Sequence, residues 1–380
     1  MIIDAHMHAF PNLGRPYGSR SMKEQNLYLQ RFVASSPAAV VKRLRDGKVE
    51  MEKSKYILWD ENDPTPNGAY DVKFSAGSFG RLQWEKDGEG YYISLYAPNM
   101  QSLESPPEFL LAHMDAAGVS MGILQNAFLY GDLNEFISDA VKKYPDRFIG
   151  TIQINESKAD GPEEIKKLRK GAIEQGLKAL YYANERFFEI GFSINFDDER
   201  FDEFWSEVRD LGLPVFWDIT AIYEKGEYIS SAYERFMKQM LRLEGWHKRF
   251  PEIPCILVHG IPLRNIRDKD NFIPIREELW NIWKRPNMHL ELLFPMQVSH
   301  PVPGGTVWDY PYLEIHPLIR ELMSHLGPEK LIWGTDLPNT ERNCTYAQAR
   351  NYLDKHCPLL SSEDKKLVFG ENIRRIFRLG

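Results

Sequence analysis

Short apolar runs alternate with amphipathic segments along most of the chain after Pro106. Runs of strand length predict strands buried on both faces, whereas apolar residues spaced three and four apart predict helices. Strands are expected at 1–8, 119–125, 147–154, 177–183, 213–218, 254–259, 288–294 and 330–336. Helices are expected at 108–117, 132–144, 162–174, 201–211, 230–250 and 361–377.

This alternation predicts an α/β fold with a parallel sheet covered by helices. Eight strands favour a closed (β/α)8 TIM barrel over an open, doubly wound sheet. An open nucleotide-binding sheet would also need a glycine-rich loop after its first strand. The sequence there is His8-Ala9-Phe10-Pro11, which is no such loop.

Residues 12–105 depart from this pattern. A Ser-Pro pair predicts the start of a helix over 36–44. Asp87-Gly88 is a hairpin signal between apolar runs at 81–84 and 91–96.

The expected division is therefore a barrel of residues 1–11 and 106–380, with an α+β insertion at 12–105. The insertion follows the first strand directly, so we expect it to pack over the C-terminal mouth of the barrel as a lid, or to form the interface of a homodimer or higher homo-oligomer. Its many aromatic side chains could equally form a small core of its own.

The composition is that of a soluble globular enzyme, because 43% of the 380 residues are hydrophobic and 27% are charged. The net charge of −7 argues against a nucleic-acid partner. No apolar run has bilayer length, so no membrane span is expected. The sequence starts without an export signal, and its three cysteines form no paired framework, which predicts a cytoplasmic protein.

Two histidines close the first predicted strand. Residues two apart on a strand point to the same face, so His6 and His8 can present two imidazoles to one divalent ion. The alternative is a pair of hydrogen-bonded histidines without a metal. In a barrel the active site lies at the carboxyl ends of the strands, which is where this pair stands.

Other strands carry ligand residue types as well: Asp218 ends the fifth, His259 the sixth and Asp336 the eighth, and Glu291 lies on the seventh. This coincidence at one end of the barrel is the main argument for a metal centre. It predicts one divalent ion, Zn²⁺ or Mn²⁺, and a small-molecule substrate.

Four further side chains are candidates for contact with that substrate. Asn184 and Arg186 follow the fourth strand, and Arg186 could pair with a substrate carboxylate. Glu291 and His300, which lies in the loop after the seventh strand, complete the set. Lys178 starts its strand at the wrong end of the barrel for a lysine that bridges two metals, so a single ion is expected.

Several motifs resemble the amidohydrolase superfamily, and in particular the amidohydrolase-2 branch with members similar to aminocarboxymuconate semialdehyde decarboxylase. They are Ile3-Asp4-Ala5-His6-Met7-His8, Val258-His259-Gly260, Trp333-Gly334-Thr335-Asp336-Leu337-Pro338 and the segment 195–205.

The resemblance implies that His6, His8 and Asp336 bind the metal and that His259 supports it or acts as a catalytic base. The chain departs from the family where a histidine ligand is expected on the fifth strand, because Asp218 stands there. Either Asp218 takes that ligand position, or fewer side chains hold the metal and Asp218 is a structural carboxylate.

Such a site is predicted to be a hydrolase centre. A metal-activated water would attack a carbonyl, for example of an amide, a lactone or a cyclic diketone, while Asp336 or His259 carries its proton to the leaving group. Decarboxylation of a small aromatic or unsaturated acid is the alternative, and a metal-free binding protein is a third class. A negative Asp218 in place of an imidazole favours Mn²⁺ and a less charged substrate, and hence hydrolysis.

Overall fold

Eight parallel strands form the centre of the molecule. The computed structural model describes residues 1–36, 40–222, 231–298 and 304–380. In sheet order the strands are β1 (Ile3–Met7), β6 (Met121–Leu124), β7 (Phe148–Ile152), β8 (Ala179–Ala183), β9 (Val215–Asp218), β10 (Cys255–Leu257), β13 (Met288–Leu292) and β14 (Leu331–Trp333). The eight predicted strands are confirmed, each at its expected position.

The first and last strands bring the sheet to a nearly closed barrel. The His6 backbone carbonyl accepts a hydrogen bond from the Asp336 backbone N–H at 2.8 Å, and the His8 backbone N–H donates to the Leu337 carbonyl at 2.8 Å. A parallel bridge joins Met7 to Leu337 between these two bonds. The predicted (β/α)8 architecture is confirmed, and the seam of the barrel lies at the residues expected to bind metal.

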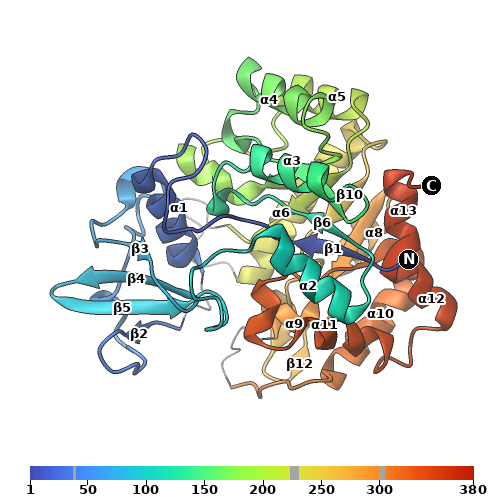
Figure 1. The fold of residues 1–380 in the computed structure, drawn as a ribbon. Helices are drawn as coiled ribbons and strands as arrows, with labels where there is room; N and C mark the ends of the chain where they lie inside the picture. Colours follow the sequence, from blue (N-terminus) through green and yellow to red (C-terminus); the bar gives the residue numbers. More distant parts are fainter. Residues whose placement is uncertain (37–39, 223–230, 299–303) are drawn as a thin grey trace.

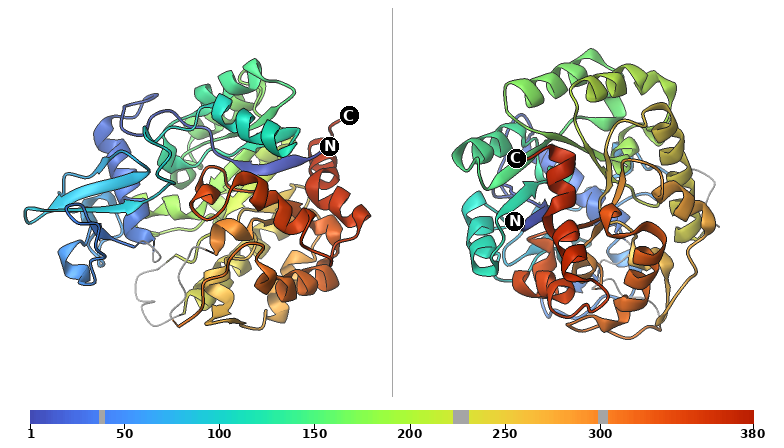
Figure 2. Two further views of the ribbon diagram at one scale, coloured as in Figure 1. Left: turned by 60° about the horizontal axis from the view of Figure 1, so that its bottom comes forward. Right: turned by 90° about the vertical axis from the view of Figure 1, so that its right-hand side faces the viewer.

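Helices surround the strands, as the view along the barrel in Figure 2 shows. The predicted helices correspond to α2 (Pro107–Ala117), α3 (Asn134–Lys143), α4 (Pro162–Ile173), α5 (Asp202–Asp210), α6 (Ala232–Arg249) and the C-terminal pair α12 (Ser362–Lys366) and α13 (Asn372–Phe377), which a π-helix (Leu367–Glu371) connects. Further helices are α7 (Leu263–Ile266), α8 (Glu277–Trp283), α9 (Phe294–Gln297), α10 (His316–Leu326) and α11 (Tyr346–Asp354), and the short strands β11 (Arg267–Asp268) and β12 (Asn271–Phe272) form a separate pair.

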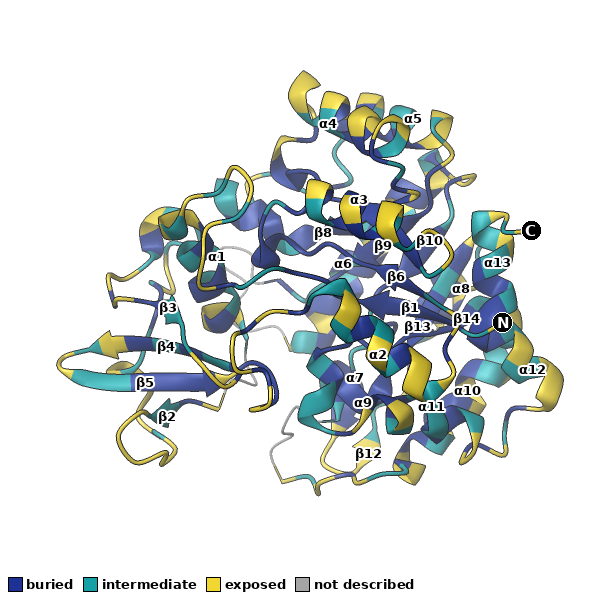
Figure 3. Cartoon of the chain, viewed as in Figure 1, coloured by how far each residue is buried: buried dark blue, intermediate teal, exposed yellow. Residues whose placement is uncertain are grey.

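The strands are buried along nearly their whole length, as the dark blue of Figure 3 shows. Between β9 and the helices α5 and α6, the indole rings of Trp205, Trp217 and Trp246 pack with centroids 4.7–5.2 Å apart. These large side chains fill the layer between strand and helices, which is why the apolar runs are so regular in the sequence.

The insertion combines one long helix with a small antiparallel sheet. Helix α1 spans Met22–Ser35, and the sheet has the order β2 (Lys42–Arg43), β5 (Glu89–Ser94), β4 (Arg81–Lys86) and β3 (Ser75–Ala76). The predicted hairpin is confirmed, and both turn residues, Asp87 at φ 51° and Gly88 at φ 79°, adopt the left-handed backbone that such a turn needs. In Figure 1 the insertion lies on the side toward which β1 points.

The helix predicted over 36–44 is wrong. Lys42 and Arg43 are extended and pair with Tyr92 and Tyr91 of β5, and residues 37–39 lie outside the described part of the chain. The helix lies earlier, where Ser21 caps α1 and Glu24 completes a capping box. Pairing with the neighbouring strand outweighed the local helix signal of the Ser-Pro pair.

Among the described residues, no helix has both the length and the apolar character needed to cross a membrane.

Close packing of helix on strand gives a test of the core. A Cβ added to the buried Gly171 of α4 would lie 2.8–3.1 Å from three side-chain atoms of Ile152 in β7. Gly171→Ala should therefore destabilise the protein by about 1–3 kcal/mol through overpacking. Urea unfolding should show a lower midpoint.

Gly245 of α6 is the matched control, since a Cβ there meets no atom within 4 Å. Gly245→Ala should raise the urea midpoint, because alanine favours a helix over glycine by up to about 1 kcal/mol. If the two variants shifted the midpoint in the same direction, the packing argument would be wrong.

Candidate metal centre

His6 and His8 face one another at the carboxyl end of β1. Their Nε2 atoms lie 3.0 Å apart, and both side chains are buried. The outer nitrogens have other partners: His6 Nδ1 lies 2.8 Å from Glu291 Oε2, and His8 Nδ1 lies 2.9 Å from the carbonyl oxygen of Gln125. The expected presentation of two imidazoles to one point is present in the structure.

These partners decide where the ring hydrogens are. A carbonyl oxygen and a carboxylate only accept, so Nδ1 of each ring carries a hydrogen. In the neutral imidazoles the two Nε2 atoms then hold lone pairs directed at one another. Two lone pairs at 3.0 Å repel unless a cation or a shared proton lies between them. Burial would lower the pKa of His6, but Glu291 and Asp336 raise it.

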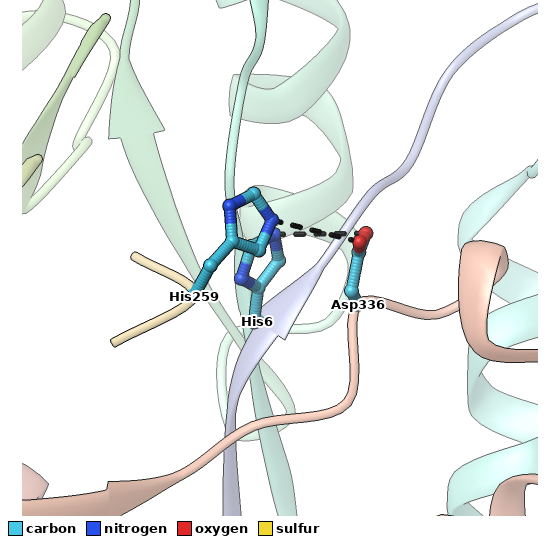
Figure 4. Close-up of side chains that lie close together, drawn as sticks. All are labelled: His6, His259 and Asp336. Carbon is cyan, nitrogen blue, oxygen red and sulfur yellow. Dashed lines mark ion pairs between the residues drawn. The ribbon is translucent and has the colours of Figure 1, made fainter. Parts of the chain in front are cut away.

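Asp336 adds a negative charge to this pair. Its Oδ1 lies 3.1 Å from His8 Nε2 and 3.7 Å from His6 Nε2. His259 stacks beside the His6 ring, with centroids 5.2 Å apart, and its Nε2 lies 3.7 Å from Asp336 Oδ2. Figure 4 shows His6, His259 and Asp336 converging, and one ligand atom of each lies within 4.8 Å of the others.

The electrostatics of the group follow from burial and close opposite charges. Burial alone would raise the pKa of Asp336, but His6, His259 and His8 outweigh it and hold that pKa well below its usual range. Burial lowers the pKa of His8, which keeps its imidazole neutral. Burial would also lower the pKa of His259, but Asp218 and Asp336 raise it to about 10. The group therefore combines a carboxylate, a neutral imidazole and a proton-rich imidazole.

Asp218 lies beside His259. Its Oδ1 is 3.5 Å from His259 Nδ1, and its Oδ2 accepts a hydrogen bond from the Tyr181 hydroxyl at 2.7 Å. The carboxylate thus faces the ring nitrogen of His259 that points away from Asp336. Its role as a metal ligand stays a prediction.

The backbone turns sharply at two of these residues. His259 and Asp336 have φ values of 62° and 60°, a left-handed conformation that is costly for residues other than glycine. Gly260, at φ 53°, follows His259, and a Cβ there would lie 2.2 Å from the Glu291 carbonyl oxygen. Strain of this kind accumulates at functional sites and is held here by the closed end of the barrel.

Several supporting residues were missed in the sequence. Asp4 accepts from the backbone N–H of His6 and of Thr335, both at 3.0 Å, and from the Tyr346 hydroxyl at 2.9 Å. Gln125 directly follows β6, the second strand of the sheet, and donates to Glu291 at 2.8 Å. The rule that singled out polar residues at strand ends would have found Gln125, whereas the contact of Asp4 with Thr335, which follows β14, has no local signal.

The four residues expected to contact substrate have different surroundings. Glu291 is buried behind His6, and its Oε2 also accepts from the His259 backbone N–H at 3.2 Å. Arg186 is buried, with Nε 3.0 Å from Glu189 and Nη1 3.6 Å from Glu156. Asn184 bonds to Thr220 and Gln239, and His300 lies outside the described residues.

None of these contacts brings Arg186 or Asn184 to the metal group. Arg186 is held by carboxylates of its own chain, and Asn184 ties the ends of β8 and β9 together. A role for either in substrate binding stays a prediction, and the same holds for Glu291.

The donor set fits a divalent ion. Ligand atoms bound at about 2 Å to one ion are separated by about 3–3.5 Å, and the atoms of His6, His8 and Asp336 lie 3.0–3.7 Å apart. Two imidazole nitrogens and one carboxylate suit Zn²⁺ or Mn²⁺. The hydrogen bonds to Glu291 and Gln125 orient the two rings in the manner usual for metal-binding histidines.

Nearly the whole chain matches one family of known proteins. The sequence model described as "Amidohydrolase" matches residues 3–379. The chain belongs to the amidohydrolase family. This confirms the resemblance seen in the sequence, and the metal-site motifs all lie within the matched region.

Both hydrolases and decarboxylases are similar to this amidohydrolase. The 4-sulfomuconolactone hydrolase of Hydrogenophaga intermedia is 22% identical over 281 residues, which are 72% of this chain and 80% of that protein. The crystal structure of a probable 2-pyrone-4,6-dicarboxylic acid hydrolase from Acinetobacter baumannii, with citric acid bound, has a TM-score of 0.54 and 16% identity over 75% of this chain and 92% of that one.

The dihydroxybenzoic acid decarboxylase of a Polaromonas species, with bound manganese and 2-nitroresorcinol, has a TM-score of 0.51 and 17% identity over 73% of this chain and 87% of that one. At these identities the solved structures establish the fold.

Removal of the two strand-end histidines tests the metal centre. His6→Ala combined with His8→Ala should abolish tight binding of Mn²⁺ or Zn²⁺, because two of the three close donor atoms are lost. Elemental analysis of the purified variant, with metal titration by calorimetry, measures this directly.

His325→Ala combined with His356→Ala removes two imidazoles from other parts of the chain and should leave the metal content unchanged. Circular dichroism should show that both double variants are folded. Metal content equal to that of the wild type in the His6/His8 variant would disprove the site.

Proposed function

We propose that this amidohydrolase is a metal-dependent hydrolase of a small cyclic or oxygenated substrate. His6, His8 and Asp336 hold one divalent ion, Mn²⁺ or Zn²⁺. The observation that carries the proposal is the convergence of the His6 and His8 Nε2 atoms, 3.0 Å apart, with a carboxylate oxygen of Asp336 3.1 Å from His8, an arrangement that a bound cation would satisfy.

When held by these residues, a divalent ion would polarise a substrate carbonyl and would lower the pKa of a water molecule. The protein moves the protons. Asp336 Oδ2 accepts one from the attacking water, and His259 Nε2, 3.7 Å away, delivers one to the leaving group. Asp218 holds Nδ1 of His259, so that Nε2 is the nitrogen that exchanges protons.

We assign Asp218 to the positioning of His259 in this scheme. One of its oxygens faces His259 and the other is held by Tyr181, so the carboxylate is fixed from both sides. Direct coordination of the metal by Asp218 is the competing assignment.

Decarboxylation is the second candidate, supported by the fold shared with dihydroxybenzoic acid decarboxylase. The same residues would serve it, since His259 could protonate the ring carbon that loses carbon dioxide. No attacking water is needed in that reaction, which separates the two candidates experimentally.

The insertion at 12–105 is assigned to closing the mouth of the barrel. The Tyr28 hydroxyl of α1 donates to Glu189 at 2.7 Å, and Ser35 donates to Glu185. Both acceptors follow the carboxyl end of β8, the end at which the metal group lies. Association of two copies through the outer side of the insertion is compatible with this role.

Asp218→Asn separates positioning from coordination. If Asp218 positions His259, Mn²⁺ affinity should stay within about twofold of the wild type while turnover falls by about 10- to 100-fold. Nitrogen NMR of the imidazoles should show a changed tautomer for His259, with His6 and His8 unaffected.

Tyr181→Phe is the matched milder variant, because it removes only the hydrogen bond on the far side of Asp218. It should weaken turnover less than Asp218→Asn does. A loss of metal affinity in Asp218→Asn would instead identify Asp218 as a ligand.

Isotope labelling in H₂¹⁸O decides between the two reactions. The probe substrates are 4-sulfomuconolactone, 2-pyrone-4,6-dicarboxylate and 2,6-dihydroxybenzoate, taken from the similar proteins. Hydrolysis should place one ¹⁸O atom in the product carboxylate without release of carbon dioxide. Release of carbon dioxide from the substrate, with no ¹⁸O in the remaining product, would show that the enzyme is a decarboxylase and would overturn the hydrolase assignment.

A further inference from the structure

A polar cavity lies away from the metal group. It has a volume of about 700 Å³ and lies between the chain that follows β1 and the small sheet of the insertion. Its lining includes Arg15, Ser78, Phe79, Arg81 and Gln101. No ligand residue of the metal group lines it. A volume of this size suits a small organic molecule.

The charge of this cavity is opposite to that of the chain. The whole sequence has a net charge of −7, yet two arginines and no acidic residue line the cavity. Within the described residues, neither Arg15 nor Arg81 has a carboxylate at ion-pair distance, although most arginines of this chain do. Among the described residues, two guanidinium groups without a carboxylate partner therefore line one solvent-accessible space.

The cavity wall holds one of these groups in place. The Arg81 guanidinium stacks over the Tyr92 ring at 4.5 Å, which fixes its plane on β4. Beside it, the exposed Phe79 has φ 60° and is held by a hydrogen bond from its backbone N–H to Gln101 at 3.2 Å. The lining thus offers a preorganised fork for an oxyanion and an aromatic face next to it.

We propose that this cavity binds a small organic anion through a carboxylate or phosphate group, at a site separate from the metal centre. Arg15 and Arg81 neutralise the oxyanion, the polar side chains of Ser78 and Gln101 lie within the same lining, and Phe79 covers the organic part.

The site is connected to the metal centre through a short stretch of chain. The Phe10 ring stacks on Tyr130 with centroids 4.5 Å apart, and Tyr130 lies 4.8 Å from the His8 ring. Leu13, two residues before Arg15, is held by a hydrogen bond from its backbone N–H to the Leu103 carbonyl at 3.1 Å. The segment that carries Arg15 is thus held in place by contacts of its own at Phe10 and Leu13.

Calorimetric titration of the metal-loaded protein at low salt tests the proposal, with benzoate and inorganic phosphate as separate probes. We expect saturable binding of at least one of them. Arg15→Gln combined with Arg81→Gln should weaken that binding by at least tenfold, because each charge-assisted hydrogen bond contributes roughly a factor of ten or more. Tighter binding of benzoate identifies a carboxylate ligand, and tighter binding of phosphate a phosphorylated one.

Two controls make the result specific. Arg320→Gln removes one exposed arginine on α10 and should leave binding unchanged. The His6→Ala/His8→Ala variant should also bind the probe as the wild type does, so failure of the metal proposal would not affect this test. Absence of saturable binding to the wild type, or binding that the His6/His8 variant loses and the Arg15/Arg81 variant keeps, would overturn the proposal.

Discussion

Two hydrogen bonds on the outer nitrogens of His6 and His8 determine what the barrel mouth can hold. Because Glu291 and the Gln125 carbonyl both accept, the remaining nitrogens point their lone pairs at one another. Glu291 lies on β13 and Gln125 directly follows β6, so two strands of the same sheet orient the two rings. A cation at their meeting point would relieve this repulsion, and Asp336 lies close enough to share it.

The carboxylates of the mouth divide into two sets with different tasks. Asp4 and Glu291 are fully buried and accept several backbone and side-chain hydrogen bonds, which lock the exits of β1, β13 and β14 together. Burial raises the pKa of Asp4 to about 6, so its charge is kept only through these donors. Asp336 and Asp218 instead flank His259, and they also accept hydrogen bonds from the side chains of Asn339 and Tyr181, respectively.

The sequence was most informative where a buried strand leads directly into a polar residue. The apolar run Cys255-Ile256-Leu257 followed by His259 shows both the strand and its exit, because a parallel strand covered on both faces tolerates few polar residues. Local signals failed at 36–44, where pairing with β5 decided the conformation. They also could not show the surroundings of Arg186, whose partners Glu156 and Glu189 are brought to it by the fold. Asp218 is a similar case. Its place at the end of a strand was predictable from the sequence, but its contacts with His259 and Tyr181 depend on the fold.

The insertion separates β1 from the other barrel strands along the sequence, and this order affects how the protein folds during synthesis. Ile3 pairs with Met121, and Met7 pairs with Leu337. More than a hundred residues must therefore be synthesised after β1 before its first neighbouring strand is available, and nearly the whole chain before its second. Contacts so distant in sequence slow folding and leave apolar strands exposed in the meantime. During synthesis the α1 helix and the hairpin of the insertion are the first partners available to the N-terminal segment. The barrel seam, and with it the site that joins His6 to Asp336, is assembled last.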